Sequence, residues 1–194
     1  MERGGFSSGE MCAMMAENAG RQRNVNLIMS DTPLLLNGLE TAETHYVDLS
    51  RLKIANCVGC FGCWVKTPGR CVIRDDAVQV YPLIARSTRV LYVTRVCFGS
   101  YDTPMKTMLE RAIPIQKAFL RLHHGETHHV QRAVAEKDAV ILAYGCPAEE
   151  ERQLFQRLVA RNASNMLLRS WRVRFVDEAE LNEAAEQEAA AWRS

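Results

Sequence analysis

Two short runs built around consecutive apolar residues constrain the fold of this chain more than any other feature. Residues 88–94 (TRVLYVT) and 139–144 (AVILAY) have the length of a strand, and neither alternates regularly between apolar and polar residues. Strands that are apolar on both sides are typical of a parallel sheet covered by helices on both faces. We therefore expect an α/β protein in which these two runs form central strands.

Weaker strand signals and helical segments alternate with these two runs. The expected strands are 25–29, 44–49, 88–94, 139–144 and 171–176. The expected helices are 75–84, 103–122, 149–162 and 178–192, the second of them kinked at Pro114. This alternation predicts a three-layer, doubly wound parallel sheet, and five strands in this length fit a flavodoxin-like order. Such sheets bind ligands beyond the carboxyl ends of their strands, so we expect a site in the loops after Met29, Thr94 and Tyr144.

Size and charge exclude several classes of protein. With 194 residues, 47% of them hydrophobic, we expect a single domain over 25–194, preceded by a flexible arm, 1–24, in which 10–19 are a candidate short helix. A net charge of +1 provides no basic field for nucleic acid or an anionic membrane. The apolar runs are far shorter than the roughly 20 residues of a membrane span. We expect a soluble, cytoplasmic protein whose seven cysteines are kept reduced.

Four of those cysteines form the sharpest motif of the sequence, Cys57-x2-Cys60-x2-Cys63-x7-Cys71. Three thiols at consecutive x2 spacings and a fourth further along are typical of ligands to a [4Fe–4S] cluster. A tetrahedral zinc site usually draws two separate cysteine pairs from distant segments. The spacing alone leaves open a cluster, a zinc site, and thiols that are inert or form a disulfide.

Four of the five histidines gather in one segment, HHGETHH, which runs from His123 to His129 and includes Glu126. Imidazoles and a carboxylate are ligands for transition metals, but Gly125 interrupts any regular helical spacing. We expect a solvated or substrate-facing loop, with a metal site as the alternative. Two further cysteines, Cys97 and Cys146, end the central strands and are expected to be small buried thiols.

Residues 52–111 resemble the NADPH-dependent FMN reductase and iron-sulfur flavoprotein branch of the flavodoxin-like superfamily. In that branch a strand leads into a C-x-G-C-x-x-C loop, a further cysteine and an Asp-Asp pair, and an aromatic-Gly-Ser loop and a helix with Lys and an acid-Arg pair follow. The matching residues here are Cys57, Cys60, Cys63, Cys71, Asp75, Asp76, Phe98, Gly99, Ser100, Lys106, Glu110 and Arg111. The resemblance covers about a third of the chain at motif level.

The resemblance implies FMN across the carboxyl ends of the strands and NAD(P)H as co-substrate. The residues it implies at the cofactor are Thr94, Arg95, Val96, Phe98, Gly99, Ser100, Tyr101, Tyr144 and Gly145. The chemistry of such an enzyme belongs to the cofactor, so we expect no catalytic side chain. Members of the branch associate so that a neighbouring subunit helps to enclose the flavin, which implies a homodimer or homotetramer.

The chain departs from the family at the loop that should hold the FMN phosphate. Family members use a Gly/Ser-rich turn after the first strand, whereas this chain has Ser30, Asp31 and Thr32, about a dozen residues before the second strand. Either the hydroxyls of Ser30 and Thr32 hold the phosphate, helped by Arg21 or Arg23, or FMN binding is weakened or lost. A third possibility is that the segment with those arginines is rearranged relative to the family.

Two functions follow from these motifs. The favoured one is an FMN-dependent oxidoreductase that takes a hydride from NAD(P)H and passes electrons to an unidentified acceptor or to a [4Fe–4S] cluster held by the four cysteines. A variant keeps the flavin only as a one-electron relay. The alternative is a flavodoxin-like binding or partner subunit that has lost FMN through its shortened phosphate loop.

Overall fold

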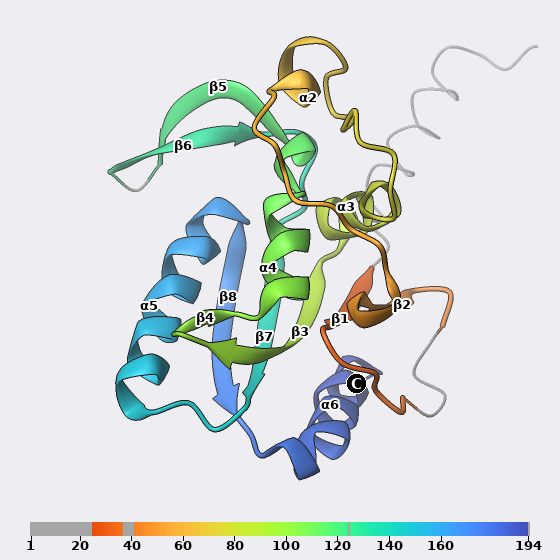
Figure 1. The fold of residues 1–194 in the computed structure, drawn as a ribbon, viewed down its shortest axis with the longest axis vertical. Coiled ribbons are helices and arrows are strands. Elements are labelled where there is room, and N and C mark those ends of the chain that lie inside the picture. The colour runs from red at the N-terminus through yellow and green to blue at the C-terminus, as the bar shows by residue number, and fades with distance from the viewer. Residues whose placement is uncertain (1–24, 37–40, 124, 194) are drawn as a thin grey trace, which may run out of the picture.

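The computed structural model describes residues 25–36, 41–123 and 125–193 (Figure 1). Five parallel strands form its main sheet in the order β2-β1-β3-β7-β8, which confirms the expected flavodoxin-like order. Their bounds are Asn26–Ser30 (β1), Thr44–Asp48 (β2), Arg89–Cys97 (β3), Lys137–Tyr144 (β7) and Leu168–Phe175 (β8). The short β4 (Ser100–Tyr101) pairs antiparallel with the end of β3.

Helices cover both faces of this sheet, so the molecule has three layers (Figure 1). On one face pack α3 (Ala77–Arg86), α4 (Thr103–Glu110) and α5 (Glu149–Asn165). On the other face lies α6 (Leu181–Ala190), the only helix found there in the described part of the chain. The two central strands, β3 and β7, are buried almost throughout, which explains why their apolar runs do not alternate.

The expected long helix over 103–122 is wrong in its second half. Helix α4 ends at Glu110, a 3₁₀ turn (η2) covers Ile113–Ile115, and the chain then forms β5 (Gln116–His123). Strand β5 pairs antiparallel with β6 (Glu126–Gln131). Pro114 has no N–H and disfavours helix in the residue before it, so the helix ends ahead of it. Gly125, with φ +80°, makes the turn of the hairpin.

Short elements complete the chain. They are η1 (Leu49–Arg51), α2 (Gly62–Val65), η3 (Glu178–Glu180) and η4 (Ala191–Arg193). The arm 1–24, with the candidate helix 10–19 and the arginines at 21 and 23, lies outside the described residues. Among the described helices, none has the length and apolarity required to cross a membrane.

Candidate functional site

The carboxyl ends of three neighbouring strands are tied together by the side chain of Asp31. Its Oδ2 accepts hydrogen bonds from Thr94 Oγ1 and from the Arg95 amide, both at 2.8 Å. Its Oδ1 accepts a hydrogen bond from the Tyr144 hydroxyl, also at 2.8 Å. Burial raises the pKa of Asp31 above its usual range, although these three hydrogen bonds oppose the shift. We call this group of four residues the Asp31 clasp.

The backbone after β1 does not form a nest for phosphate. Residues 31–35 contain four amides, since Pro33 has none, and each amide already donates within the chain. The four bonds are Asp31 N to Val93 O, Thr32 N to Ser30 Oγ, Leu34 N to Tyr46 Oη and Leu35 N to Asn182 Oδ1. The Ser30 hydroxyl is buried and donates to Thr32 O at 2.7 Å. These amides and the Ser30 hydroxyl therefore have no free proton for a phosphate oxygen.

Phe98 stands at the tip of the hairpin between β3 and β4. Phe98 and Gly99 have φ values of 51° and 69° and form the two-residue turn between Cys97 and Ser100. Both residues of such a turn have positive φ, which asparagine and glycine tolerate far better than phenylalanine. The Phe98 side chain is 89% exposed. An exposed aromatic side chain on a strained backbone is typical of a functional position.

The other predicted flavin residues separate into two groups. Val96 and Tyr101 are buried in the core, where the Tyr101 ring meets Phe155 edge-on at 5.0 Å. The Arg95 side chain lies against Gly145, since a Cβ there would come within 2.8 Å of Arg95 Cγ. Exposed surface at this edge of the sheet therefore comes from Arg95, Gly145 and Phe98 rather than from Tyr101.

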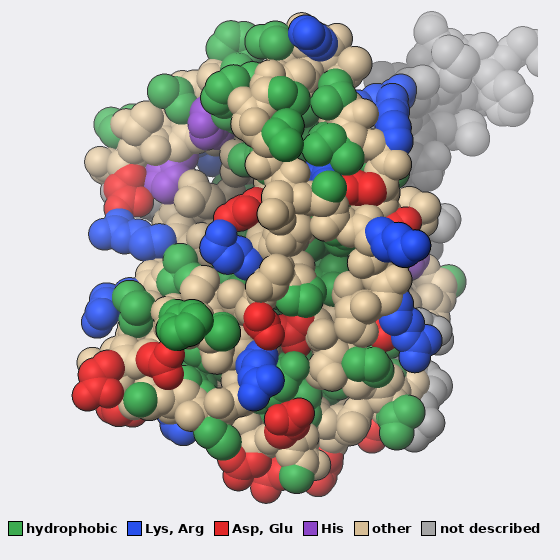
Figure 2. All heavy atoms as spheres, in the orientation of Figure 1, with side chains coloured by type: hydrophobic (Ala, Val, Ile, Leu, Met, Phe, Trp, Pro, Cys, Tyr) green, Lys and Arg blue, Asp and Glu red, His purple; other side chains and the backbone are tan. Residues whose placement is uncertain are grey.

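All four predicted metal-ligating cysteines line one small cavity of about 140 Å³. The remaining lining residues are mostly apolar, and they are Val58, Gly59, Phe61, Trp64, Val72, Ile73, Glu110, Arg111, Ile113 and Pro114. Figure 2 shows hydrophobic side chains gathered over this loop and the nearby hairpin, at the top of the view. Burial raises the pKa of the Cys63 thiol, and the charges of the three other cysteines add to the shift. Within the described ranges, no three potential metal ligands lie close enough together to hold an ion.

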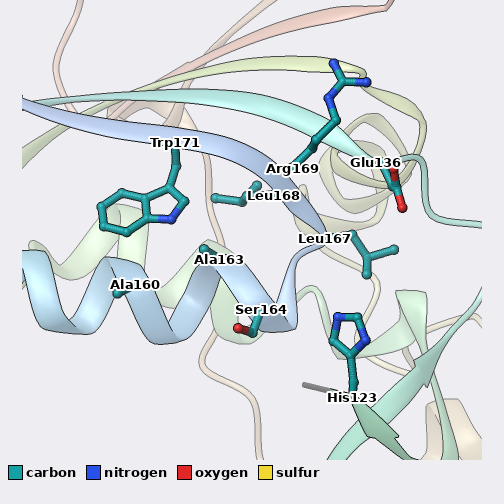
Figure 3. Close-up of a pocket in the computed structure, with 9 residues that line it drawn as sticks. All are labelled: His123, Glu136, Ala160, Ala163, Ser164, Leu167, Leu168, Arg169 and Trp171. Carbon is teal, nitrogen blue, oxygen red and sulfur yellow. The ribbon is translucent and has the colours of Figure 1, made fainter. Parts of the chain in front are cut away.

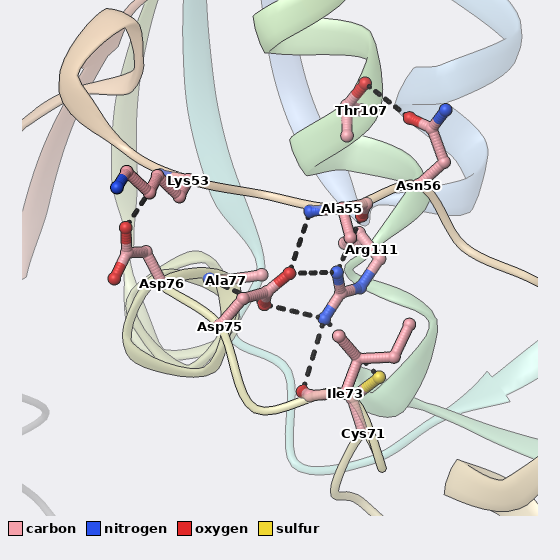
Figure 4. A network of polar contacts seen from close by, with 10 residues as sticks. All are labelled: Lys53, Ala55, Asn56, Cys71, Ile73, Asp75, Asp76, Ala77, Thr107 and Arg111. Atoms are coloured by element: carbon pink, nitrogen blue, oxygen red, sulfur yellow. Dashed lines mark hydrogen bonds and ion pairs between the residues drawn. The ribbon is translucent and has the colours of Figure 1, made fainter.

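A buried ion pair fixes the start and end of this cysteine loop (Figure 4). Arg111, 1% exposed, donates to both carboxylate oxygens of Asp75, at 2.6 and 2.8 Å. It also donates to Ala55 O at 2.6 Å, while the Ala55 amide donates back to Asp75. Burial raises the pKa of Asp75, but the hydrogen bonds from Arg111 and Ala55 outweigh it and leave that pKa lowered. The Asp-Asp and acid-Arg parts of the motif thus meet, although they were not predicted as site residues.

Two buried N–H groups beside this cavity have no acceptor among the described residues. They are Nε1 of Trp64 and Nε of Arg111. Buried donors without partners are rare in proteins, and each one calls for an explanation. Four thiolates with their inorganic sulfurs would supply anionic acceptors at this place. The four thiols and the unpartnered N–H groups have the chemistry that an iron-sulfur cluster requires, although among the described residues no three ligands lie close enough together to hold a metal ion.

The histidine segment is a hairpin rather than a solvated loop. His128 is buried between Asn165 Oδ1, at 2.9 Å, and Glu126 Oε2, at 3.0 Å. The His129 ring lies 4.7 Å from that of Trp64. These contacts attach the hairpin to α5 and to the cysteine loop. His124 lies outside the described residues.

A second cavity, of about 290 Å³, is lined by none of the residues predicted to bind FMN or a cluster (Figure 3). It opens beside the amino ends of β7 and β8, with Trp171, Arg169, Glu136 and His123 among its walls. Of the residues predicted to carry function, it contains only His123. The predicted burial of the two remaining thiols is also incorrect, because Cys97 is half-buried and Cys146 exposed.

Comparison with known proteins relates the sequence to iron-sulfur flavoproteins. No protein-family model matches the chain. An iron-sulfur flavoprotein of Archaeoglobus fulgidus is 33% identical over 78 residues, which make up 40% of this chain and 33% of the relative. One from Methanocaldococcus jannaschii is 26% identical over 80 residues, 41% of this chain and 40% of the relative. The chain thus spans about two fifths or less of the length of these curated relatives.

Solved structures share the fold over most of the chain. An FMN-dependent NADH-azoreductase from Bacillus anthracis has a TM-score of 0.54 and 11% identity, covering 88% of this chain and 99% of that one. An NAD(P)H:quinone oxidoreductase from Methanothermobacter marburgensis has a TM-score of 0.53 and 10% identity, covering 87% and 97%. The chain therefore has the flavodoxin-like fold that these flavin reductases share. In sequence it resembles the iron-sulfur flavoproteins.

Proposed function

We propose that this chain is a redox protein of the iron-sulfur flavoprotein type. Cys57, Cys60, Cys63 and Cys71 hold a [4Fe–4S] cluster, and FMN binds at the carboxyl edge of β1, β3 and β7. The observation that carries the proposal is that all four thiols of the motif line one apolar cavity. The limited sequence similarity to iron-sulfur flavoproteins supports the same assignment.

The cysteine loop has the properties that a cluster requires. Its thiols come from one short segment, so one loop can wrap the cluster while the fourth thiol arrives from further along. The Asp75–Arg111 pair holds the segment before Cys57 against the segment after Cys71. The walls of the cavity are mostly apolar, although Cys57 and Cys60 are exposed to solvent. The polarity around a cluster and its exposure to solvent influence its reduction potential. A zinc ion would use the same thiols without electron transfer, so iron content distinguishes the two.

The carboxyl edge of the sheet is where a flavin binds in this fold. Arg95, Phe98 and Gly145 leave surface there for a planar ring, and Arg95 offers a positive charge. When bound, FMN supplies the exchange between a two-electron donor such as NAD(P)H and one-electron carriers such as a cluster. Its phosphate does not fit the amides of residues 31–35, so the proposal requires that Arg95 or residues outside the described ranges neutralise it.

The Asp31 clasp favours a second candidate function, an electron-carrying or partner domain without flavin. A carboxylate fixed at the ends of three strands repels a phosphate dianion, and its hydrogen bonds use donors that a flavin would otherwise take. In this candidate the cysteine loop is the single redox site. We propose assembly into a homodimer or homotetramer only for the first candidate, in which a second copy at the edge of the sheet would help to enclose FMN.

An anaerobic absorbance spectrum tests both candidates. Protein produced with iron supplied is measured for iron and acid-labile sulfide, and then titrated with FMN and with NADPH or NADH. Four irons per chain and saturable FMN binding are expected for the first candidate. Iron without FMN binding leaves the second candidate, and a Cys71→Ser variant that keeps all its iron would contradict both.

A further inference from the structure

The four-cysteine cavity contains buried hydrogen-bond donors that the chain itself leaves unused. Arg111 carries five N–H donors in a rigid, planar fork. Its Nη1 donates to Asp75 and to Ala55 O, each at 2.6 Å. Its Nη2 donates to Asp75 at 2.8 Å and otherwise meets only Ile73 O and Cys71 Sγ, both at 3.5 Å. One side of the guanidinium is thus tightly bound. On the other side Nη2 makes two long hydrogen bonds, and Nε has no acceptor among the described residues.

The side of the guanidinium away from Asp75 faces Cys71, the one cysteine drawn in Figure 4. In an arginine bound end-on through Nη1 and Nη2, the Nε–H lies parallel to the outer Nη2–H. That Nη2 group lies 3.5 Å from Cys71 Sγ, and Nε has no acceptor among the residues described. A side chain that is 1% exposed cannot satisfy these donors with bulk water. The fork therefore presents a parallel pair of donors on the side of Cys71.

Trp64, which directly follows Cys63 in the middle of the motif, adds a second donor. Its ring stacks on Phe61 at 5.3 Å and lies 4.7 Å from that of His129, so its orientation is fixed from two sides. Its Nε1 is buried without an acceptor in the described part of the chain. Since tryptophan donates and cannot accept, a group with an available lone pair is required to satisfy it. Trp64 and Arg111 both line the cavity that contains the four thiols.

We propose that Trp64 Nε1–H and the free edge of Arg111 donate hydrogen bonds to the sulfur atoms of the group that the four cysteines hold, and thereby stabilise its reduced state. Hydrogen bonds to sulfur raise the reduction potential of iron-sulfur centres, because reduction adds negative charge that the donors stabilise. Both residues act through the sulfurs and are positioning residues. The inference rests on the proposed function, because it requires a redox-active group in this cavity.

The test is the reduction potential of the reconstituted protein with Trp64→Phe. Phenylalanine keeps an aromatic ring for the stack and removes only the N–H. We expect the equilibrium constant for one-electron reduction to fall by about tenfold, which corresponds to about 59 mV towards lower potential. Trp171→Phe, in the separate 290 Å³ cavity that none of the four cysteines lines, is the matched control and should leave the potential unchanged.

A second variant keeps the inference falsifiable if Trp64→Phe fails to fold. Arg111→Lys keeps the charge but removes the parallel donors, and it should lower the potential while four irons remain bound. Potentials equal to that of the wild type in both iron-loaded variants would overturn the inference and leave the proposed function intact. A wild-type protein that binds no iron would overturn the proposed function, and this inference with it.

Discussion

At the carboxyl edge of the sheet, the donors around Asp31 all have acceptors within the chain. Beside the cysteines, two buried donors have no acceptor among the residues that the structure describes. The first region is therefore complete without a ligand. The second contains an energetic deficit, because a buried N–H without a partner loses its hydrogen bond to water and gains nothing in return. The contrast indicates that a bound group would stabilise the cysteine cavity more than the carboxyl edge, because of the two regions only the cavity has buried donors that lack an acceptor among the described residues.

The two regions also differ in how their carboxylates are neutralised. Asp75 has a guanidinium partner and a lowered pKa, while Asp31 has only neutral donors and a raised one. With neutral donors, the stabilisation of a buried carboxylate depends on the number and geometry of several hydrogen bonds. With arginine as the partner, it depends mainly on one side chain. A substitution at Asp75 and one at Asp31 should therefore change the free energy of unfolding by different amounts.

The largest expected effect comes from Asp75→Ala. It leaves the buried charge of Arg111 unpaired, which should lower the free energy of unfolding by about 3–5 kcal/mol. Urea unfolding followed by circular dichroism measures the change. Arg51→Ala, which removes an ion-pair partner that is 76% exposed, is the control and should change stability by less than about 1 kcal/mol. Equal decreases in the free energy of unfolding of the two variants would show that burial of the Asp75–Arg111 pair adds nothing to stability beyond that of an exposed ion pair.

Asp31→Ala should have the next largest effect. It leaves the hydroxyls of Thr94 and Tyr144 and the Arg95 amide without their acceptor, at a cost of about 2 kcal/mol. Removing the negative charge should also tighten FMN binding by at least about tenfold, measured by fluorescence titration. Unchanged FMN affinity in a folded variant would mean that the clasp does not exclude the phosphate. Asp177→Ala, an exposed acid after β8, is the control.

A smaller effect is the pH dependence of stability that Asp31 contributes. Its pKa is raised in the folded protein, so between its unfolded and folded pKa values the folded state binds more protons than the unfolded state. The contribution of Asp31 to stability is therefore present at low pH and is lost as pH rises through the folded pKa. Unfolding curves of the wild type and Asp31→Asn from pH 3 to pH 8 should show this slope only in the wild type. Parallel pH profiles would contradict it.

The smallest expected effect is a gain in stability from Phe98→Asn. Asparagine adopts the positive φ of this turn with less strain, and the gain should be about 0.5–1 kcal/mol in thermal unfolding. Phe98→Leu keeps the strain and should show no gain. If Phe98 contacts a flavin, Phe98→Asn should also weaken FMN binding. Loss of FMN affinity without any gain in stability would mean that the backbone strain is negligible.

The strand order could be predicted because a strand that is buried on both faces has consecutive apolar residues instead of an alternating pattern. The runs that became β3 and β7 each contain consecutive apolar residues, 90–93 and 139–144, and no helical pattern competes with them. The second half of the expected 103–122 helix failed because β5 combines polar and apolar residues without clear alternation. Two residues in the sequence indicated the hairpin: Pro114 ends a helix, and Gly125 permits a tight turn between two strands.

The candidate site was predictable only where its residues are close in sequence. The cysteines that line one cavity come from a segment of 15 residues, 57–71, and their spacing was sufficient. The clasp joins Asp31 to Tyr144, 113 residues apart, and no local pattern indicates that pairing. Asp75 and Arg111 were visible as parts of a motif, but their contact depends on how α4 packs beside α3.

The arrangement of helices has a consequence for how the chain folds as it is synthesised. Helix α6 follows all five strands in the chain, and of the described helices it alone packs on its face of the sheet. On that face Ile28, Leu91 and Leu142 have no other described α-helix to cover them while the ribosome is still adding residues 181–190. Exposed apolar surface on a nascent chain promotes aggregation. Chaperones that bind such surfaces would meet this protein until its final helix has emerged.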